Sequence, residues 1–368
     1  MDRAALRAAV WGRLEARESD LLRLCQQLVR IPSVNGVHPE EDIARAIAAA
    51  LRGRGLHPQI HAFAPGRPTI LTTLGEGDEG VLFIGHMDTV AAGDRDAWSV
   101  DPFSGTIRDG RLYGRGACDN KAGIAVAIIL LDVLQEWAEL LEGRVLLCCV
   151  PDEESGATGR IGIKPMLAEG RLKATQAIYT YPGLDLLSIG HRGLLRVRVR
   201  AWGEATHTGG QAWECGERGA NAVTALAQLL LELERWQPTF EPHAAFPGRR
   251  PVVTPGTLFR GGEMESMVPP YAEAMIDVRL LPGQQADRLL ERMQEISNEV
   301  AKGRPGIRFE WDKLVDLPAV SIPHDTPIVE SLAWWTERLM GKSPTIAGAG
   351  PANEGYLLIE AGILTVCG

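Results

Sequence analysis

The stretch "VLFIGHMDTV" (residues 81–90) places a histidine and an aspartate directly after an apolar run. Four consecutive apolar residues followed by Gly85 are typical of a short buried strand that ends in a turn. His86 and Asp88 then lie where this strand ends, with one residue between them. Two interpretations are open. The pair belongs to the turn, as a lone His-x-Asp more often does, or His86 is a metal ligand and Asp88 is the carboxylate that orients it.

The sequence around this strand predicts an α/β domain. Apolar residues at helical spacing predict helices over residues 21–29, 43–51 and 122–137. Continuous apolar runs predict strands over residues 69–74, 81–84 and 144–150. This alternation is typical of a mixed, mostly parallel sheet with helices on both faces.

After about residue 187 the pattern changes to that of a second domain. Residues 194–202 alternate between apolar residues and arginine, which predicts a strand with one wet face. We expect the elements that follow to be a helix over 220–236, a loop over 240–256, a strand ending at 277–279 and a helix over 286–300. The sequence thus predicts an inserted α+β domain over residues 188–301. Residues 1–187 and 302–368, with a helix over 326–340, form the interrupted domain.

Composition excludes several classes of protein. The chain has 368 residues, enough for two domains, and a net charge of −9, which disfavours broad nucleic-acid binding. Its longest apolar stretch, around residues 123–134, is too short to cross a bilayer, and no signal peptide is evident. Six cysteines without a CxxC pair fit a reduced, cytoplasmic protein.

Two further polar clusters lie at places comparable to that of His86. The segment "YGRGACDNKAG" (residues 113–123) carries Asp119 in a glycine-rich turn before a predicted helix, and the Asp-Glu-Glu run at 152–154 follows the strand 144–150. Asp119 could simply be a helix N-cap, and an acidic run usually opens a helix or faces solvent. However, sites in open α/β sheets gather at the carboxyl ends of strands. The sequence therefore predicts that these side chains share one pocket.

These residue types together indicate a metal-dependent hydrolase. Zinc takes imidazole and carboxylate ligands, and a catalytic site leaves one position open for water. The two oxygens of Asp119 could bridge two ions, while Asp88 fixes the tautomer of His86. One of the two glutamates can bind metal and the other can take a proton from water. A phosphate-binding glycine loop and a serine nucleophile elbow are both missing, so nucleotide-binding and serine-hydrolase readings are disfavoured.

The order and local sequence of these motifs resemble the zinc aminoacylase and carboxypeptidase family that includes carboxypeptidase G, acetylornithine deacetylase and succinyl-diaminopimelate desuccinylase. The resemblance runs from about residue 22 to the last residue and implies a catalytic α/β domain with an inserted lid domain. It also implies that His86 binds one zinc ion, Asp119 bridges two, Glu154 binds the other, Glu153 is the general base and Asp88 holds His86. The peptide bond after Asp119 is expected to be cis.

The resemblance extends to two residues of the inserted domain. In "ATHTGG" (residues 205–210) it implies that His207 reaches the active site of a partner subunit and helps to polarise the scissile carbonyl. In "DVRLLPG" (residues 277–283) it implies that Arg279 binds the substrate carboxylate, which a guanidinium can hold by both oxygens. A homodimer formed through the lid domain is therefore expected. Without the resemblance, His207 would read as a loop histidine and Arg279 as a surface residue.

The chain departs from the family pattern at three places. Tyr181, in "YTYPGLD" (residues 179–185), stands where an acidic metal ligand is usual, and Asp185 is a conceivable substitute. Ser266 stands where an asparagine is common. The chain stops at "GILTVCG", whereas the family continues towards a histidine that completes the second zinc site. The first and third departures imply one protein ligand fewer for each ion, and Ser266 concerns one substrate or oxyanion contact.

Two hypotheses follow. The first is a zinc-dependent hydrolase, with Co²⁺ or Mn²⁺ as possible substitutes, that cleaves the amide bond of N-acyl amino acids or small peptides with a free carboxylate. In it, Glu153 is the general base for a metal-activated water. The alternative is a metal-poor family relative that acts as a scaffold binding a ligand or partner, which Tyr181 and the missing histidine favour.

Overall fold

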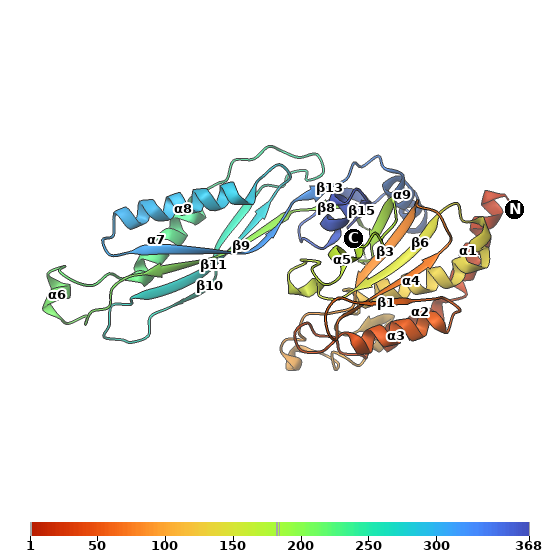
Figure 1. Ribbon diagram of the computed structural model, residues 1–368, viewed down its shortest axis with the longest axis horizontal. Coiled ribbons are helices and arrows are strands. Elements are labelled where there is room, and N and C mark those ends of the chain that lie inside the picture. Colours follow the sequence, from red (N-terminus) through yellow and green to blue (C-terminus); the bar gives the residue numbers. More distant parts are fainter. Residues whose placement is uncertain (1, 182, 184, 368) are drawn as a thin grey trace. The chain divides into compact units, whose positions relative to one another are not determined.

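The computed structural model describes residues 2–181, 183 and 185–367, and these divide into two compact units (Figure 1). The first unit contains the residues up to His191, Ser321–Ala349 and those from Asn353 onward. The second unit is formed by Arg192–Val320 together with Gly350–Ala352. An inserted unit was expected to end at residue 301, so the second unit extends further along the chain than predicted.

The first unit is built on a mixed six-stranded sheet. Its strands, in spatial order, are β1 (Gln59–Ala62), β2 (Pro68–Leu74), β6 (Arg144–Val150), β3 (Gly80–His86), β7 (Gln176–Tyr179) and β15 (Leu364–Val366). The β6–β3, β3–β7 and β7–β15 pairs are parallel, whereas β1–β2 and β2–β6 are antiparallel. The carboxyl ends of β6, β3 and β7 therefore lie at one edge of the sheet, as the predicted α/β architecture requires.

Helices cover this sheet because their apolar residues recur at helical spacing. The bounds are α1 (Arg3–Glu15), α2 (Glu18–Val29), α3 (Glu41–Arg52), α4 (Lys121–Leu134), α5 (Ile163–Ala168), α9 (Pro327–Met340) and α10 (Gly355–Glu360). The helices α2, α3 and α4 share one core with the sheet, in which Leu28, Ile47 and Ile128 are fully buried. The helices α9 and α10 contact β15. The helix expected over residues 122–137 ends at Leu134 and continues as a 3₁₀ segment, Gln135–Leu140.

Two small sheets complete the first unit. One has the order β13 (Val320–Ser321), β8 (Leu186–His191) and β14 (Thr345–Ala349), with β8 and β14 parallel. The other is the hairpin of β4 (Thr106–Arg108) and β5 (Arg111–Tyr113), which precedes α4.

The second unit is an antiparallel sheet with the order β10 (Val252–Gly261), β11 (Tyr271–Leu280), β9 (Gly193–Trp202) and β12 (Arg308–Leu317). The helices α7 (Ala222–Arg235) and α8 (Ala286–Lys302) pack on it, and α6 (Gln211–Glu214) is a single short turn. The predicted alternation of β9 is confirmed, because Val197 and Val199 are buried while the intervening arginines are partly exposed. Pairing of β12 with β9 explains why the unit runs to Val320.

One expected loop was wrong in part. Residues 252–256, placed by sequence in a Pro/Gly-rich loop, belong to β10. The strand lies at the sheet edge and its register shifts between Pro255 and Leu258. An edge strand with an irregularity tolerates proline and glycine because fewer of its backbone groups need partners.

Among the residues that the structure describes, no helix combines the length and apolarity needed to span a membrane.

Candidate metal centre

His86 is the last residue of β3, and its side chain is completely buried. Its Nδ1 lies 3.0 Å from the backbone carbonyl oxygen of Asp88, and its Nε2 lies 2.7 Å from Oδ1 of Asp119. With Nδ1 donating to the carbonyl, Nε2 is free to act as a ligand on the side of Asp119. This arrangement fits the ligand interpretation of His86 better than the turn interpretation.

Asp119 lies two residues before the first residue of α4 and does not cap the helix. The N-cap position is Asn120, whose side chain makes no capping hydrogen bond and instead donates to the carbonyl oxygen of Thr180 at 2.9 Å. Gly123 packs so close to Thr180 that an added Cβ would lie 1.8 Å from its carbonyl oxygen. The start of α4 is thereby fixed against the end of β7. The peptide bond between Asp119 and Asn120 is cis, as expected.

Glu153 and Glu154 follow β6 in the short 3₁₀ turn Glu153–Ser155. One potential ligand atom from each of His86, Glu153 and Glu154 lies within 4.8 Å of the others. Since Asp119 contacts His86 directly, the end of β3, the segment before α4 and the turn after β6 meet in one place. The predicted convergence of these three motifs is therefore present in the fold.

Asp88 holds this arrangement together in a way that the sequence did not suggest. Its carboxylate was expected to hold His86, and Oδ1 lies 3.5 Å from Nδ1, while the backbone carbonyl oxygen of Asp88 is nearer at 3.0 Å. The carboxylate also accepts the backbone N–H groups of Glu153 at 3.2 Å and Glu154 at 3.0 Å. Asp88 thus orients the imidazole with its backbone and the glutamate turn with its side chain.

Negative charge accumulates in this cluster. Burial, helped by the charges of Glu154, Asp88 and Asp119 and opposed by that of His86, raises the pKa of Glu153 to about 7. The pKa of Glu154 is also raised, chiefly by burial. For His86, burial lowers the pKa, but hydrogen bonds to Asp119 and Asp88 outweigh it and raise the pKa well above its usual value.

These residues fit a divalent cation. They offer one imidazole nitrogen and several carboxylate oxygens, the donor types that zinc accepts. Buried carboxylates are stable only when paired or when they coordinate metal, and His86 is the only basic side chain among the four residues of the cluster, His86, Asp119, Glu153 and Glu154. A cation between Nε2 and the carboxylates would relieve this imbalance.

A buried network behind Asp88 was not predicted. The Asn35 amide donates to Oδ2 of Asp88 at 2.6 Å and to Oδ1 of Asp152 at 3.2 Å. Arg67 donates to the same Asp152 oxygen at 2.7 Å and also binds the fully buried Glu40. In the sequence, Asn35 precedes a glycine and looks like a turn residue, so nothing signals its contact with a residue 53 positions away.

Glu354 is a second residue that the sequence analysis missed. It begins α10, is completely buried, and its Oε2 lies 3.5 Å from the hydroxyl of Tyr179, while Oε1 has no hydrogen-bond partner in the described structure. Burial, followed by the charges of Glu153 and Asp88, raises its pKa well above the usual value. No hydrophobic periodicity or motif distinguishes this glutamate from a surface acid.

Tyr181 does lie beside the cluster. Its ring centroid is 5.8 Å from that of His86, and it stacks on Tyr179 at 4.9 Å. Burial and the nearby carboxylates of Glu153 and Asp119 raise its pKa well above 10, so the phenol stays neutral. Asp185, the suggested substitute, is exposed and pairs with Lys342. Pro182 and Leu184, within the same sequence segment, lie outside the described residues.

The two remaining predicted residues belong to the second unit. His207 is exposed, and its Nδ1 accepts the backbone N–H of Gly209 at 3.1 Å, which leaves a donor on Nε2. Arg279 donates through Nε to Asp277 at 2.7 Å, and 26% of its side chain is exposed. Ser266 contributes its carbonyl oxygen to Thr208.

Comparison with known proteins agrees with these features. A model of peptidase family M20/M25/M40 matches residues 82–367. A succinyl-diaminopimelate desuccinylase from Gluconacetobacter diazotrophicus is 28% identical over 359 residues, covering 93% of this chain and 87% of its own length. An acetylornithine deacetylase from Photorhabdus laumondii subsp. laumondii is 26% identical over 333 residues, covering 87% of this chain and 82% of its own length.

A solved structure from Bacillus subtilis, described as a dinuclear metal binding peptidase from the M20 family, has a TM-score of 0.66 and 18% identity. The match covers 95% of this chain and 88% of that chain, and at this identity it supports the fold alone. The family model, by contrast, extends over most of the sequence and includes all three motifs of the cluster. The chain therefore belongs to peptidase family M20/M25/M40 and is a metal-dependent hydrolase.

Proposed function

We propose that the chain hydrolyses the amide bond of N-acyl amino acids or small peptides that carry a free carboxylate. The observation that carries the proposal is the meeting of His86, Glu153 and Glu154, with Asp119 against His86, at the carboxyl end of the parallel strands. The names of relatives, a desuccinylase and a deacetylase that both act on acylated amino acids, support this substrate class.

Zinc is the proposed cofactor, with Co²⁺ or Mn²⁺ as substitutes, because the donors are one imidazole and several carboxylates. His86 and Glu154 would each hold one ion, and Asp119 would lie between the two. Bound there, the ions supply Lewis acidity that activates water and polarises the acyl oxygen.

Glu153 is the proposed general base. It is nine-tenths or more buried, and its carboxyl has a pKa near 7, raised chiefly by burial, so it can both accept and release a proton close to neutral pH. In the proposed reaction it takes the proton from the attacking water and returns it to the leaving amine. Asp88 supports this role because its carboxylate binds the backbone N–H of Glu153 and thereby fixes the base.

Two residues of the second unit are proposed to act on the substrate. His207 would donate from Nε2 to the acyl oxygen in the active site of a partner subunit, since its Nδ1 is occupied by Gly209. Arg279 would bind the free carboxylate with the donors that Asp277 does not use.

A homodimer through the second unit is part of the proposal. The strand β10 lies at the edge of its sheet, and an edge strand offers unpaired backbone groups to another chain. Apolar side chains are exposed on it and on the neighbouring helix α7, with exposed fractions of 42% for Phe259 and 51% for Leu231. A cytoplasmic location is also proposed, and the six free cysteines support it.

The test is a substrate screen on metal-loaded protein. The chain is stripped with chelator, reloaded with Zn²⁺, Co²⁺ or Mn²⁺, and assayed on N-acetyl and N-succinyl amino acids and on dipeptides, with metal content measured in parallel. Release of free amine that requires metal supports the proposal. A chain that binds metal stoichiometrically but releases no amine from any of these compounds would overturn it, whereas a chain without bound metal would favour a scaffold role.

A further inference from the structure

A cavity of about 570 Å³ lies in the first unit beside the predicted metal centre. Its lining includes Asn35, Arg67, Asp152, Ser155, Arg160 and Lys164. Asp152 and Ser155 flank the two glutamates directly in sequence, and Asn35 binds the carboxylate of Asp88 at 2.6 Å. The cavity therefore shares the Asp152–Ser155 turn with the proposed reaction centre, and its volume suits a small organic group.

The positive charges of this cavity are of two kinds. Arg67 already forms ion pairs with two carboxylates of the described residues, those of Glu40 and Asp152, so its charge is balanced. Arg160 and Lys164 are exposed at the cavity, and neither forms an ion pair with any of the described residues. Two cations without acidic partners are thus available to an incoming anion, in a chain with a net charge of −9.

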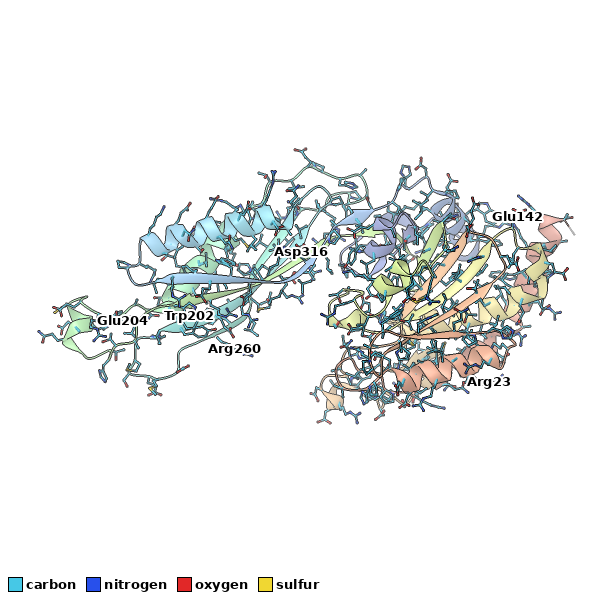
Figure 2. The ribbon with its side chains drawn as sticks, in the orientation of Figure 1. Arg23, Glu142, Trp202, Glu204, Arg260 and Asp316 are labelled. Atoms are coloured by element: carbon cyan, nitrogen blue, oxygen red, sulfur yellow. The ribbon has the colours of Figure 1, made fainter. Side chains whose placement is uncertain are left out.

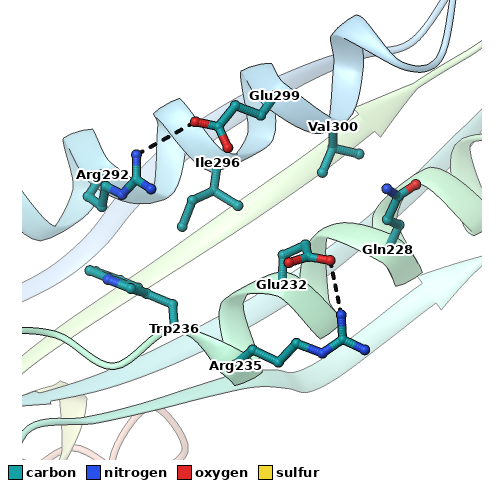
Figure 3. A pocket seen from close by; sticks show the side chains of 8 residues that line it. All are labelled: Gln228, Glu232, Arg235, Trp236, Arg292, Ile296, Glu299 and Val300. Atoms are coloured by element: carbon teal, nitrogen blue, oxygen red, sulfur yellow. Dashed lines mark hydrogen bonds and ion pairs between the residues drawn. The ribbon is translucent and has the colours of Figure 1, made fainter.

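A groove on the second unit is also lined by charged side chains, but these are paired with one another. It lies between α7 and α8 and has a volume of about 380 Å³ (Figure 3). Its arginines are matched by neighbouring acids, Arg292 with Glu299 at 3.7 Å and Arg235 with Glu232 at 3.1 Å. Those charges neutralise one another, so the groove offers no comparable attraction for an anion.

We propose that the cavity at Arg160 and Lys164 is a subsite that binds the carboxylate of an acidic acyl group, as in an N-succinyl amino acid. This rests on the proposed function, in which Arg279 takes the carboxylate on the amine side of the scissile bond. A second anionic group on the acyl side then needs its own cations. Arg160 can bond both oxygens of a carboxylate, and Thr158, which also lines the cavity, adds a hydroxyl donor.

The subsite also accounts for the Asn35–Arg67–Asp152 network. Asp152 lies in the left-handed region, with φ of 71°, and Arg67 and Asn35 both bind its Oδ1. These two hydrogen bonds hold the Asp152 carboxylate on Asn35 and Arg67, so that it does not compete with the substrate for Arg160 and Lys164. This part of the cavity lining is therefore already held in place before an anion binds.

The decisive variant is the double substitution Arg160→Gln/Lys164→Gln. The readout is the ratio of kcat/KM for an N-succinyl amino acid to that for the N-acetyl derivative of the same amino acid. We expect the ratio to fall by about 10- to 100-fold, as the loss of charge-assisted hydrogen bonds implies. Arg52→Gln/Lys173→Gln removes two exposed cations of the first unit outside the cavity and should leave the ratio as in the unmodified chain.

A binding measurement makes the inference independent of turnover. Titration calorimetry with succinate should give weaker binding to the Arg160/Lys164 variant than to the control variant. Equal succinate affinity in the two variants, or an unchanged substrate ratio, would overturn the subsite. If the unmodified chain cleaves neither substrate, the proposed function fails, and the succinate titration alone then decides whether the cavity binds carboxylates.

Discussion

Two histidines of this chain, one in each unit, have opposite surroundings. His86 is completely buried, with both ring nitrogens engaged and with Glu153 and Glu154 close by. His207 is exposed on a loop, and its one described side-chain hydrogen bond is to the backbone of Gly209, two residues away. The comparison teaches that the chemistry of the first histidine follows from its own neighbours, whereas that of the second depends on what approaches it from outside.

The largest effect should come from the buried cluster. Replacement of Glu153 by alanine should lower kcat by about 10²- to 10⁴-fold, because the proton acceptor is lost, while bound metal is retained. Turnover assays and metal analysis of the same preparation check both expectations. The exposed Glu142, labelled in Figure 2, provides the control, and Glu142→Ala should behave as the unmodified chain. Normal turnover in Glu153→Ala would show that Glu153 is not the general base. The surroundings of His86 would then not differ from those of His207 in this respect.

The exposed histidine gives the next test of the comparison. If Nε2 of His207 donates to the acyl oxygen, His207→Ala should lower kcat by about 10²- to 10³-fold. His243 is a matched control, since its Nδ1 likewise accepts a backbone N–H two residues away, from Ala245 at 3.2 Å. If His207→Ala and His243→Ala have equal kinetics, His207 is only a loop residue.

Arg279 tests whether the second unit binds the substrate. Loss of a charge-assisted hydrogen bond costs about 1.5–3 kcal/mol, so Arg279→Ala should raise KM by about 10- to 150-fold. Arg260, on β10 of the same unit and labelled in Figure 2, is the control. The effect should vanish for a substrate amide that lacks the free carboxylate. A KM increase that is the same for both compounds would contradict carboxylate binding.

A smaller effect is expected behind the cluster. In Asp88→Asn, the acceptor of the Glu153 and Glu154 backbone N–H groups is weakened, and metal affinity should fall by about 10- to 100-fold. Competition with a chelator measures this affinity. The exposed Asp42→Asn on α3 is the matched change and should leave it unaltered. Unaltered metal affinity in Asp88→Asn would mean that the Glu153–Ser155 turn keeps its position without the Asp88 carboxylate.

The smallest effect is expected at Tyr181. Its phenol stays neutral beside His86, and a neutral phenol is a poor ligand, so Tyr181→Phe should change metal affinity by less than about threefold. The same chelator competition applies. A large loss of metal in Tyr181→Phe would show that the phenol binds the ion, and the cluster would then include a third kind of donor.

The fold could be anticipated where periodicity was strong. The strand over residues 144–150 has the predicted bounds, and the half-exposed strand β9 differs by one residue. The short edge elements could not be anticipated. Residues 252–256 form a strand because β11 supplies their backbone partners, and such pairing leaves no mark in local composition.

The sequence by itself determined which side chains could bind a metal and which of them follow a strand. Hydrophobic periodicity and turn-forming residues reveal this because both are properties of a short segment of the chain. Tertiary structure decided how they are held. Asp88 uses its carbonyl for the imidazole and its carboxylate for the glutamate turn, Asn35 secures it, and Glu354 is buried nearby. Apart from the contact between His86 and Asp88, these contacts join residues that are 53 or more positions apart, and only the packing of the sheet brings them within hydrogen-bonding distance.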